Sequence, residues 1–247
     1  MLKQEIISPQ KSTPLRKNTS QRLTIKIGKN KLDNIFLING NSFITENITD
    51  SNLIIKANSY YMVINNGKNR LDLLYSQDIS NHEVIYDPYK YESSEKVNYK
   101  AEFFKKRYNI PEGYIDTLPK WYSFKFTYQE YNLIFIRPEF GLSIQTHKHR
   151  NETWEILEGK PIIISKKEVY YFVETGTKFY NPINAYHSVI NPNKEADKFV
   201  IIRERWDGKF DENDINRVFN PNHYTKLFFK HVKSRQKPDY KLRKKSK

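Results

Sequence analysis

Short runs of β-branched and aromatic residues, separated by turn residues, dominate the hydrophobic pattern of the chain. In the first third, Asn-Gly pairs at 39–40 and 66–67 lie between such runs, which is the usual signature of hairpins. The pattern resumes in the second half, where Gly, Pro and Asn turns separate eight runs: WYSFKFTY, NLIFIRP, GLSIQTH, TWEILEG, PIIIS, VYYFV, AYHSVI and KFVIIRER. Strands of this length, with no helix between them, predict an antiparallel sandwich or barrel.

One segment between the two β regions has a helical pattern. It is SEKVNYKAEFFKKRYNI, residues 94–110, and it ends before Pro111. We therefore expect five parts along the chain: a basic, disordered N-terminal arm over 1–20, a β-rich unit over 21–76, a connector with one helix over 77–118, a β-barrel domain over 119–225 and a basic tail over 226–247.

The positive charge of the chain is concentrated at its two ends. The formal net charge is +14, of which residues 1–31 carry +7 and residues 230–247 carry +8, so the rest of the chain has a net charge of −1. Basic termini of this kind could contact nucleic acid or anionic lipid by releasing counterions. The alternative is a pair of solubilising ends without a specific partner.

Composition excludes several classes of protein. The chain has no cysteine, so disulfides, thiolate metal sites and cysteine nucleophiles are excluded. With 38% hydrophobic and 15% aromatic residues, its 247 residues can bury a core. No apolar run reaches the roughly 18 residues of a membrane-spanning helix, and the N-terminus lacks the apolar stretch of a secretion signal. We expect a cytoplasmic protein without a membrane span.

The histidines of the second β region form a candidate metal site. Side chains at i and i+2 of a strand share a face, so Gln145, His147 and His149 are expected to project inward together. Glu152 follows after a short turn, and His187 is available on a later strand. Imidazoles and a carboxylate enclosed together are typical of a divalent metal site. The remaining histidines, His82, His223 and His231, lie in polar segments and are expected to be solvated.

The spacing of these residues resembles the two sequence motifs of the cupin family. The first motif matches Gly141, His147, His149, Glu152 and Gly159, and the second matches Gly176, Pro182, His187 and Asn191. Asn184 stands where the second motif usually has glycine, and asparagine tolerates the left-handed conformation better than most residues. The resemblance implies an all-β fold, the double-stranded β-helix or jelly-roll barrel of cupins.

A longer segment resembles one branch of that family. RPEFGLSIQTHKHRNETWEILEGKP is similar to the mannose-6-phosphate isomerase type II domain, which is also the C-terminal domain of mannose-1-phosphate guanylyltransferases. Pro119-Lys120-Trp121 and DENDINRVFNPNHY at 211–224 resemble its flanking elements, so the resemblance covers about residues 115–225. The guanylyltransferase part has no counterpart, because its Gly-rich start is absent, and nucleotidyl transfer is therefore disfavoured.

The resemblance implies one divalent metal ion, with zinc as the first choice and manganese or iron as alternatives. The ligands it implies are His147, His149, Glu152 and His187. Gln145 is a rival ligand, because the LSIQxH segment of type I phosphomannose isomerases, which is also similar, uses this glutamine for zinc. A metal held in this way keeps open positions and acts as a Lewis acid.

The substrate implied by the resemblance is a phosphorylated sugar, and the reaction is the interconversion of mannose 6-phosphate and fructose 6-phosphate. Arg150 and Arg217 are expected to bind the phosphate, since a guanidinium suits its geometry, and Arg217 also lies near the reacting carbons in related isomerases. Gln145 and Trp154 are expected to contact the sugar, Trp154 by stacking. Glu204, in the strand IIRER, is the expected proton carrier.

Several alternatives stay open at this level. The domain could be a non-catalytic cupin that binds a sugar or sugar nucleotide, or a structural cupin whose basic ends contact a polyanion. It could also be a sugar-nucleotide epimerase or ketoisomerase, or an oxygenase if the metal is iron. The N-terminal β unit is either a degenerate second cupin or an unrelated β extension. It has no histidine before His82, so it cannot hold an equivalent metal site. A homodimer is plausible, because strand edges in such barrels can pair.

Overall fold

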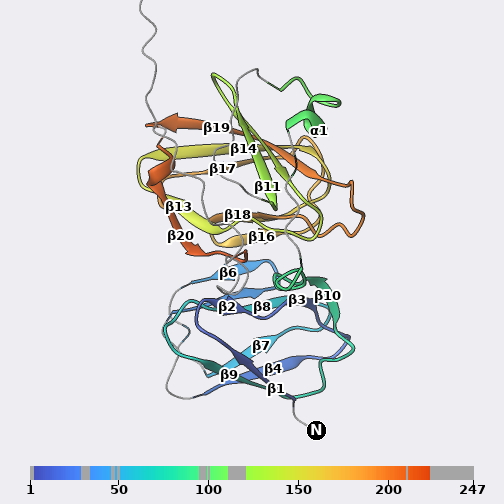
Figure 1. Ribbon diagram of the computed structural model, residues 1–247. Coiled ribbons are helices and arrows are strands. Elements are labelled where there is room, and N and C mark those ends of the chain that lie inside the picture. The colour runs from blue at the N-terminus through green and yellow to red at the C-terminus, as the bar shows by residue number, and fades with distance from the viewer. Residues whose placement is uncertain are drawn as a thin grey trace, which may run out of the picture.

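A computed structural model describes residues 3–28, 34–45, 48, 51–94, 99, 101–110, 121–209 and 211–222. Two stacked β units make up almost all of it, the N-terminal unit in blue and teal and the C-terminal unit in green to red (Figure 1). The basic tail expected over 226–247 and two of the expected solvated histidines, His223 and His231, lie outside the described residues. None of the helices within the described ranges is long and apolar enough to cross a membrane.

The N-terminal unit is a sandwich of two antiparallel sheets. One sheet has the order β1-β9-β4-β7, and the other contributes the order β10-β3-β8-β5-β6, with β2 paired to β8. The strands are β1 (Lys3–Ile7), β2 (Lys11–Ser12), β3 (Leu15–Lys17), β4 (Leu23–Ile27), β5 (Ile35–Asn39), β6 (Ser42–Ile44), β7 (Asn52–Ile55), β8 (Tyr60–Asn65), β9 (Leu71–Tyr75) and β10 (Glu83–Tyr86).

The C-terminal unit is a second sandwich, and its consecutive long strands alternate between the two sheets as in a jelly roll. One sheet has the order β11-β12-β19-β14-β17, and the other half has the order β16-β15-β18-β13-β20. The elements are α1 (Ala101–Lys105), β11 (Ser123–Thr127), β12 (Asn132–Ile136), β13 (Ile144–His147), β14 (Arg150–Glu158), β15 (Ile162–Ser165), β16 (Glu168–Tyr170), β17 (Lys178–Asn181), β18 (His187–Ile190), β19 (Val200–Gly208), η1 (Glu212–Asp214) and β20 (Ile215–Phe219).

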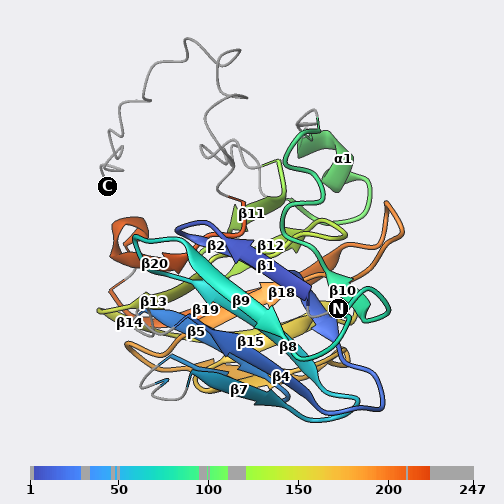
Figure 2. The ribbon, with the colours of Figure 1, turned by 90° about the horizontal axis from the view of Figure 1, so that it is seen from below.

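The two units share one continuous sheet. Its halves join where β6 pairs with β16 through Ser42 and Glu168, and the two halves then lie one above the other (Figures 1 and 2). An apolar cluster with members from both halves fills the space between them, including Phe36 and Phe43 from one unit and Ile162 and Ile164 from the other. Both faces of these strands are therefore buried, which explains why their sequences are continuous apolar runs rather than alternating ones.

Each sandwich also has an interior core of its own. Ile25, Val63 and Leu73 belong to the core of the N-terminal unit, and Trp154 and Ile202 belong to that of the C-terminal unit. A fourth cluster lies under α1, where Phe104 packs on the outer face of the β11-β12-β19 sheet. The candidate site is thus held in a barrel that is packed on both sides.

The structure corrects the expected disordered arm over 1–20. Residues 3–17 form three strands, and Leu15 is completely buried. The sequence of this segment is strongly basic, but its charges are compensated by tertiary contacts: the Arg16 guanidinium lies 3.3 Å from the Glu5 carboxylate. Charge composition alone does not reveal a carboxylate partner on a strand of the other sheet.

Two smaller expectations are also changed. The helix expected over 94–110 spans only Ala101–Lys105 of the described residues, since residues 106–107 form a turn, and residues 95–98 and 100 lie outside the described part. His82, expected to be solvated, is 4% exposed, and its Nδ1 lies 2.7 Å from the hydroxyl of Tyr61. The loop after β9 folds over the end of the sandwich and buries this ring.

Candidate metal centre

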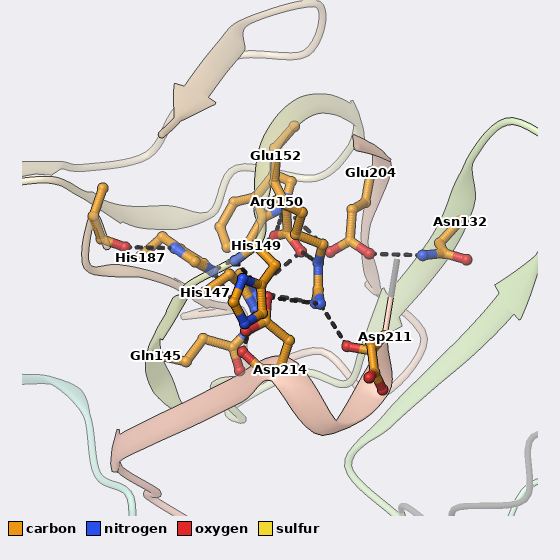
Figure 3. A network of polar contacts seen from close by, with 12 residues as sticks. Asn132, Gln145, His147, His149, Arg150, Glu152, His187, Glu204, Asp211 and Asp214 are labelled. Carbon is orange, nitrogen blue, oxygen red and sulfur yellow. Dashed lines mark hydrogen bonds and ion pairs between the residues drawn. The ribbon is translucent and has the colours of Figure 1, made fainter. Parts of the chain in front are cut away.

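Three neighbouring strands carry the side chains of the candidate site. On β14 the burial alternates strictly, so Arg150, Glu152 and Trp154 face the interior of the barrel. Gln145 and His147 share a face of β13, and His187 begins β18, where it pairs with Gln145. Figure 3 shows Gln145, His147, Arg150, Glu152 and His187 turned toward one another from separate strands.

His147, Glu152 and His187 form a compact and fully enclosed group. Their potential ligand atoms all lie within 4.8 Å of one another, and the residues are only 2%, 1% and 1% exposed. Nε2 of His147 is 3.1 Å from Oε1 of Glu152, and Nε2 of His187 is 3.5 Å from Oε2. Two imidazoles and a carboxylate at these separations are a donor set that fits a divalent metal ion.

Backbone carbonyls orient both imidazoles. Nδ1 of His147 lies 3.2 Å from the carbonyl oxygen of Asp214, and Nδ1 of His187 lies 2.9 Å from that of Ala185. A carbonyl can only accept, so each Nδ1 carries a proton and each Nε2 faces Glu152. This is the tautomer in which Nε2 can bind a metal ion, or hold a proton in its absence.

The ionisation of the group suits metal binding near neutral pH. Burial lowers the pKa of His187 to about 4, so its ring is neutral at pH 7. Burial by itself would raise the pKa of Glu152, but the contact with His147 and the nearby charges, that of Arg150 among them, hold this pKa well below its usual range. The site therefore offers a carboxylate and a neutral imidazole at once.

Gln145 is the fourth residue at the cage, and His149 is not part of it. The amide Nε2 of Gln145 is 3.5 Å from Nε2 of His187, whereas the side chain of His149 is exposed. The expected alternation fails for His149 because β13 ends at His147, and the chain then turns before β14 begins. The structure thus places Gln145 beside the group of His147, Glu152 and His187, and His149 outside it.

The turn that includes η1 supports the cage from outside. The carboxylate of Asp214 accepts hydrogen bonds from the backbone N–H groups of Lys148 and His149, at 3.0 and 2.9 Å. Its backbone carbonyl orients His147, as described above. One aspartate therefore fixes both the β13–β14 turn and the ring of His147.

Arg150 is buried inside the barrel rather than exposed to a phosphate. Its Nε donates to Oε1 of Glu152 at 2.8 Å, and its NH1 donates to the carbonyl oxygen of Asp211 at 2.7 Å. Its NH2 is 3.3 Å from Nε2 of His147. The guanidinium is thus held by the site itself (Figure 3).

A cavity beside the cage gathers four of the residues singled out in the sequence. Gln145, Arg150, Glu204 and Arg217 all line it, with β11 on one side of the opening and β20 on the other. The cavity has a volume of about 50 Å³, which is space for a few water molecules. Arg217 is exposed at the opening on β20, while Glu204 is 3% exposed on β19.

Glu204 is a buried carboxyl with an altered proton affinity. Burial, together with the charge of Glu152, raises the pKa of Glu204 above its ordinary value. Asn132 donates to Oε1 at 2.7 Å, and the indole N–H of Trp154 lies 3.3 Å from Oε2 and 3.2 Å from Oε2 of Glu152. Trp154 is completely buried and bridges the two carboxyl groups, so the structure does not present its ring for stacking.

Sequence reasoning missed Lys125 and Asn132. Lys125 lines the cavity from β11, and its Nζ is 3.8 Å from Glu204. Asn132 is completely buried on β12, directly opposite Glu204. A polar residue in the otherwise apolar run NLIFI was the available signal for Asn132, but only strand pairing reveals its partner.

Residues 111–220 match the family model described as mannose-6-phosphate isomerase C-terminal. The predicted resemblance to the mannose-6-phosphate isomerase type is thereby confirmed for this part of the chain. No curated protein matches the chain.

Solved structures with a similar fold include a presumed sugar phosphate isomerase from Acidithiobacillus ferrooxidans, at 20% identity over 33% of this chain and 50% of that one, with a TM-score of 0.29. The cupin-2 domain protein Rru_A2000 from Rhodospirillum rubrum is 17% identical over 37% of this chain and 66% of that one, with a TM-score of 0.30. Salicylate 1,2-dioxygenase from Pseudaminobacter salicylatoxidans is 11% identical over 82% of this chain and 69% of that one, with a TM-score of 0.30. The chain spans at most two thirds of the length of the first two proteins.

Proposed function

We propose that the C-terminal barrel is a metal-dependent isomerase of phosphorylated sugars, and that it interconverts mannose 6-phosphate and fructose 6-phosphate. One observation carries the proposal: the buried group of His147, Glu152 and His187 lies beside a cavity that also holds Glu204, a carboxyl with a raised pKa. The family match of residues 111–220 supports the choice of substrate.

His147, Glu152 and His187 would hold the metal. Gln145 would add a fourth ligand once its amide oxygen, which accepts a hydrogen bond from Ser143 in the structure, turns toward the ion. The nitrogen and oxygen donors suit zinc, manganese or iron. When bound, the ion would supply Lewis acidity and polarise the carbonyl of the sugar. The carbonyl contacts of both Nδ1 atoms keep the rings turned for this purpose.

Glu204 would carry the proton. An isomerisation between an aldose and a ketose moves one proton between adjacent carbons, so a single carboxyl can remove it and return it. A raised pKa brings this carboxyl closer to the working pH, which favours exchange in both directions. Asn132 and Trp154 hold Glu204 at the cavity and keep its orientation fixed.

Lys125 and Arg217 would bind the phosphate at the opening. They line the cavity from the two edge strands that flank it, β11 and β20. Because the cavity is small, the reacting end of the sugar would enter it while the phosphate remains between these two cations. This leaves Arg150 close to the reacting oxygens rather than to the phosphate.

The test is an isomerase assay with mannose 6-phosphate on protein reconstituted with zinc, manganese or iron. We expect Glu204→Gln to lower kcat by about 100-fold or more with unchanged metal content, since it removes the proton carrier and keeps the shape. Glu155→Gln is the matched control, because Glu155 lies on the adjacent strand β14 and pairs with Arg203 on the other face of the sheet. Metal-loaded wild-type protein that does not isomerise the substrate would contradict the proposal and favour a cupin that only binds its ligand.

A further inference from the structure

The guanidinium of Arg150 contacts atoms of two candidate metal ligands, Glu152 and His147. It donates to Oε1 of Glu152 at 2.8 Å and lies 3.3 Å from Nε2 of His147. A guanidinium can donate but cannot accept, so both contacts use electron pairs of candidate metal ligands. Arg150 therefore places a positively charged side chain next to the atoms that would bind a metal ion.

The backbone holds Arg150 in this position. Its NH1 donates to the carbonyl oxygen of Asp211 at 2.7 Å and lies 3.8 Å from the carboxylate of Asp214. These contacts are made by Asp211 and Asp214, which are not members of the cage. The side chain is only 1% exposed, so water does not screen its charge.

The other barrel contains a related arrangement, in which an arginine balances a carboxylate. There Arg16 lies 3.3 Å from both oxygens of Glu5, and the adjacent ring is the phenol of Tyr75. An internal guanidinium is therefore sufficient to neutralise a carboxylate in this fold. In the C-terminal barrel the corresponding pair of Arg150 and Glu152 lies beside the imidazoles of His147 and His187.

We propose that Arg150 is an internal counter-cation that competes with the metal: it neutralises Glu152 when the cage is empty and withdraws from His147 when a divalent ion binds. Glu152 keeps Arg150 nearby through Oε1 in both states, and the displaced NH2 turns toward the cavity that Arg150 already lines. Metal occupation is thereby coupled to the presentation of a positive charge to the substrate. The inference rests on the proposed function only in taking this group as the metal site.

The experiment compares metal affinities of full-length variants by competition with a chromophoric chelator, using zinc and manganese. Arg150→Gln is expected to bind each ion at least about tenfold more tightly than the wild type, because one cation has been removed from beside the site. Arg150→Lys, which retains the charge, should stay close to the wild-type affinity. Arg217→Gln serves as the control, since Arg217 lines the cavity but does not touch the cage.

Arg150→Gln leaves Glu152 buried without its cation, so this variant is expected to be less stable than the wild type. Thermal unfolding with and without saturating zinc therefore provides a second measurement of metal binding. The added ion should raise the Tm of this variant more than that of the wild type. Equal or weaker binding by Arg150→Gln would overturn the inference while leaving the proposed function intact. Binding by Arg150→Gln but not by the wild type would support the inference and remove the proposed metalloenzyme. Absence of binding in both proteins would overturn both.

Discussion

The two barrels of this chain share one strand order but have different interiors. The N-terminal unit reads β1-β9-β4-β7 against β10-β3-β8-β5-β6, and the C-terminal unit reads β12-β19-β14-β17 against β20-β13-β18-β15-β16. Each position of one series corresponds to a position of the other, and β11 is an additional edge strand. The N-terminal unit therefore has the same strand topology as the C-terminal barrel.

Strand register identifies equivalent residues. Tyr61 pairs with Arg16 on one side and with Asn39 on the other, whereas His187 pairs with Gln145 and Ser165 in the same places. Tyr61 thus occupies the position of His187, and Arg16 occupies that of Gln145. Where the C-terminal barrel has the imidazole of His187 and the amide of Gln145, the N-terminal barrel has the phenol of Tyr61 and the guanidinium of Arg16.

These substitutions turn a candidate ligand site into a structural cluster. Burial raises the pKa of Tyr61 and of Tyr75 well above the ordinary value, so neither phenol becomes a phenolate at neutral pH. Tyr75 instead donates to Glu5 at 2.6 Å, and Tyr61 contacts His82. The comparison teaches that the barrel supplies the geometry, while the residues at a few inward positions decide whether it can bind an ion.

The largest effect is expected from exchanging the two equivalent residues. His187→Tyr should lower metal affinity by about 100-fold or more, because a protonated phenol cannot replace a neutral imidazole. Tyr61→His should not create a second site, since Arg16 remains beside it in place of Gln145. Elemental analysis of purified protein measures both outcomes, and a second ion per chain in Tyr61→His would show that the comparison is incomplete.

The next effect concerns a buried asparagine that is repeated in both barrels. Asn65 donates to the carbonyls of Ile7, Ser8 and Asn69, and Asn191 donates to those of Ile136 and Lys198.

Replacement of either asparagine by alanine leaves buried carbonyl groups unpaired. Asn65→Ala and Asn191→Ala should each lower the free energy of unfolding by about 2–3 kcal/mol. Denaturant titration measures the loss, with exposed Asn216→Ala as the control. A large loss for one asparagine and none for the other would contradict their equivalence.

A smaller effect is expected from the ion pair in the N-terminal barrel. Glu5→Gln should cost about 1–2 kcal/mol, less than a fully buried pair, because the Glu5 side chain is 26% exposed and Arg16 can reach water. Asp72→Asn removes the more exposed pair with Arg70 and should change stability by less than about 0.5 kcal/mol. Chemical denaturation measures the free energy of unfolding of both variants. Equal losses for Glu5→Gln and Asp72→Asn would argue against a structural role for the Glu5–Arg16 pair.

The smallest expected effect is a pH dependence that arises from His82. Burial, followed by the charge of Arg16, lowers the pKa of His82 in the folded chain. Below pH 6.5 the unfolded chain takes up a proton that the folded chain resists, so stability falls as the pH drops. Between pH 7.5 and 5.5 this contributes at most about 1 kcal/mol. His82→Gln should flatten the stability profile in that window, and an unchanged profile would exclude this contribution.

Much of the fold could be predicted from the sequence because local pattern determines it. The β-rich runs, their turns and the cupin motif of the second half follow from residue types at short range, and the structure has strands in those places. The sequence also contains a short repeat: Val63-Ile64-Asn65 follows Tyr61 at the same distance as Val189-Ile190-Asn191 follows His187. The strands over residues 3–17 were missed because their partners are distant in sequence.

By itself, the sequence determined the β class, the barrel of the second half and the identity of His147, Glu152 and His187 as a candidate group. Only the tertiary structure decided that Gln145 rather than His149 joins them, that Arg150 lies within the cage and that Glu204 faces it from another strand. The physical reason is the range of the interactions. Side-chain alternation operates within one strand, whereas the end of a strand, a change of partner or the burial of a charge depends on residues tens of positions away.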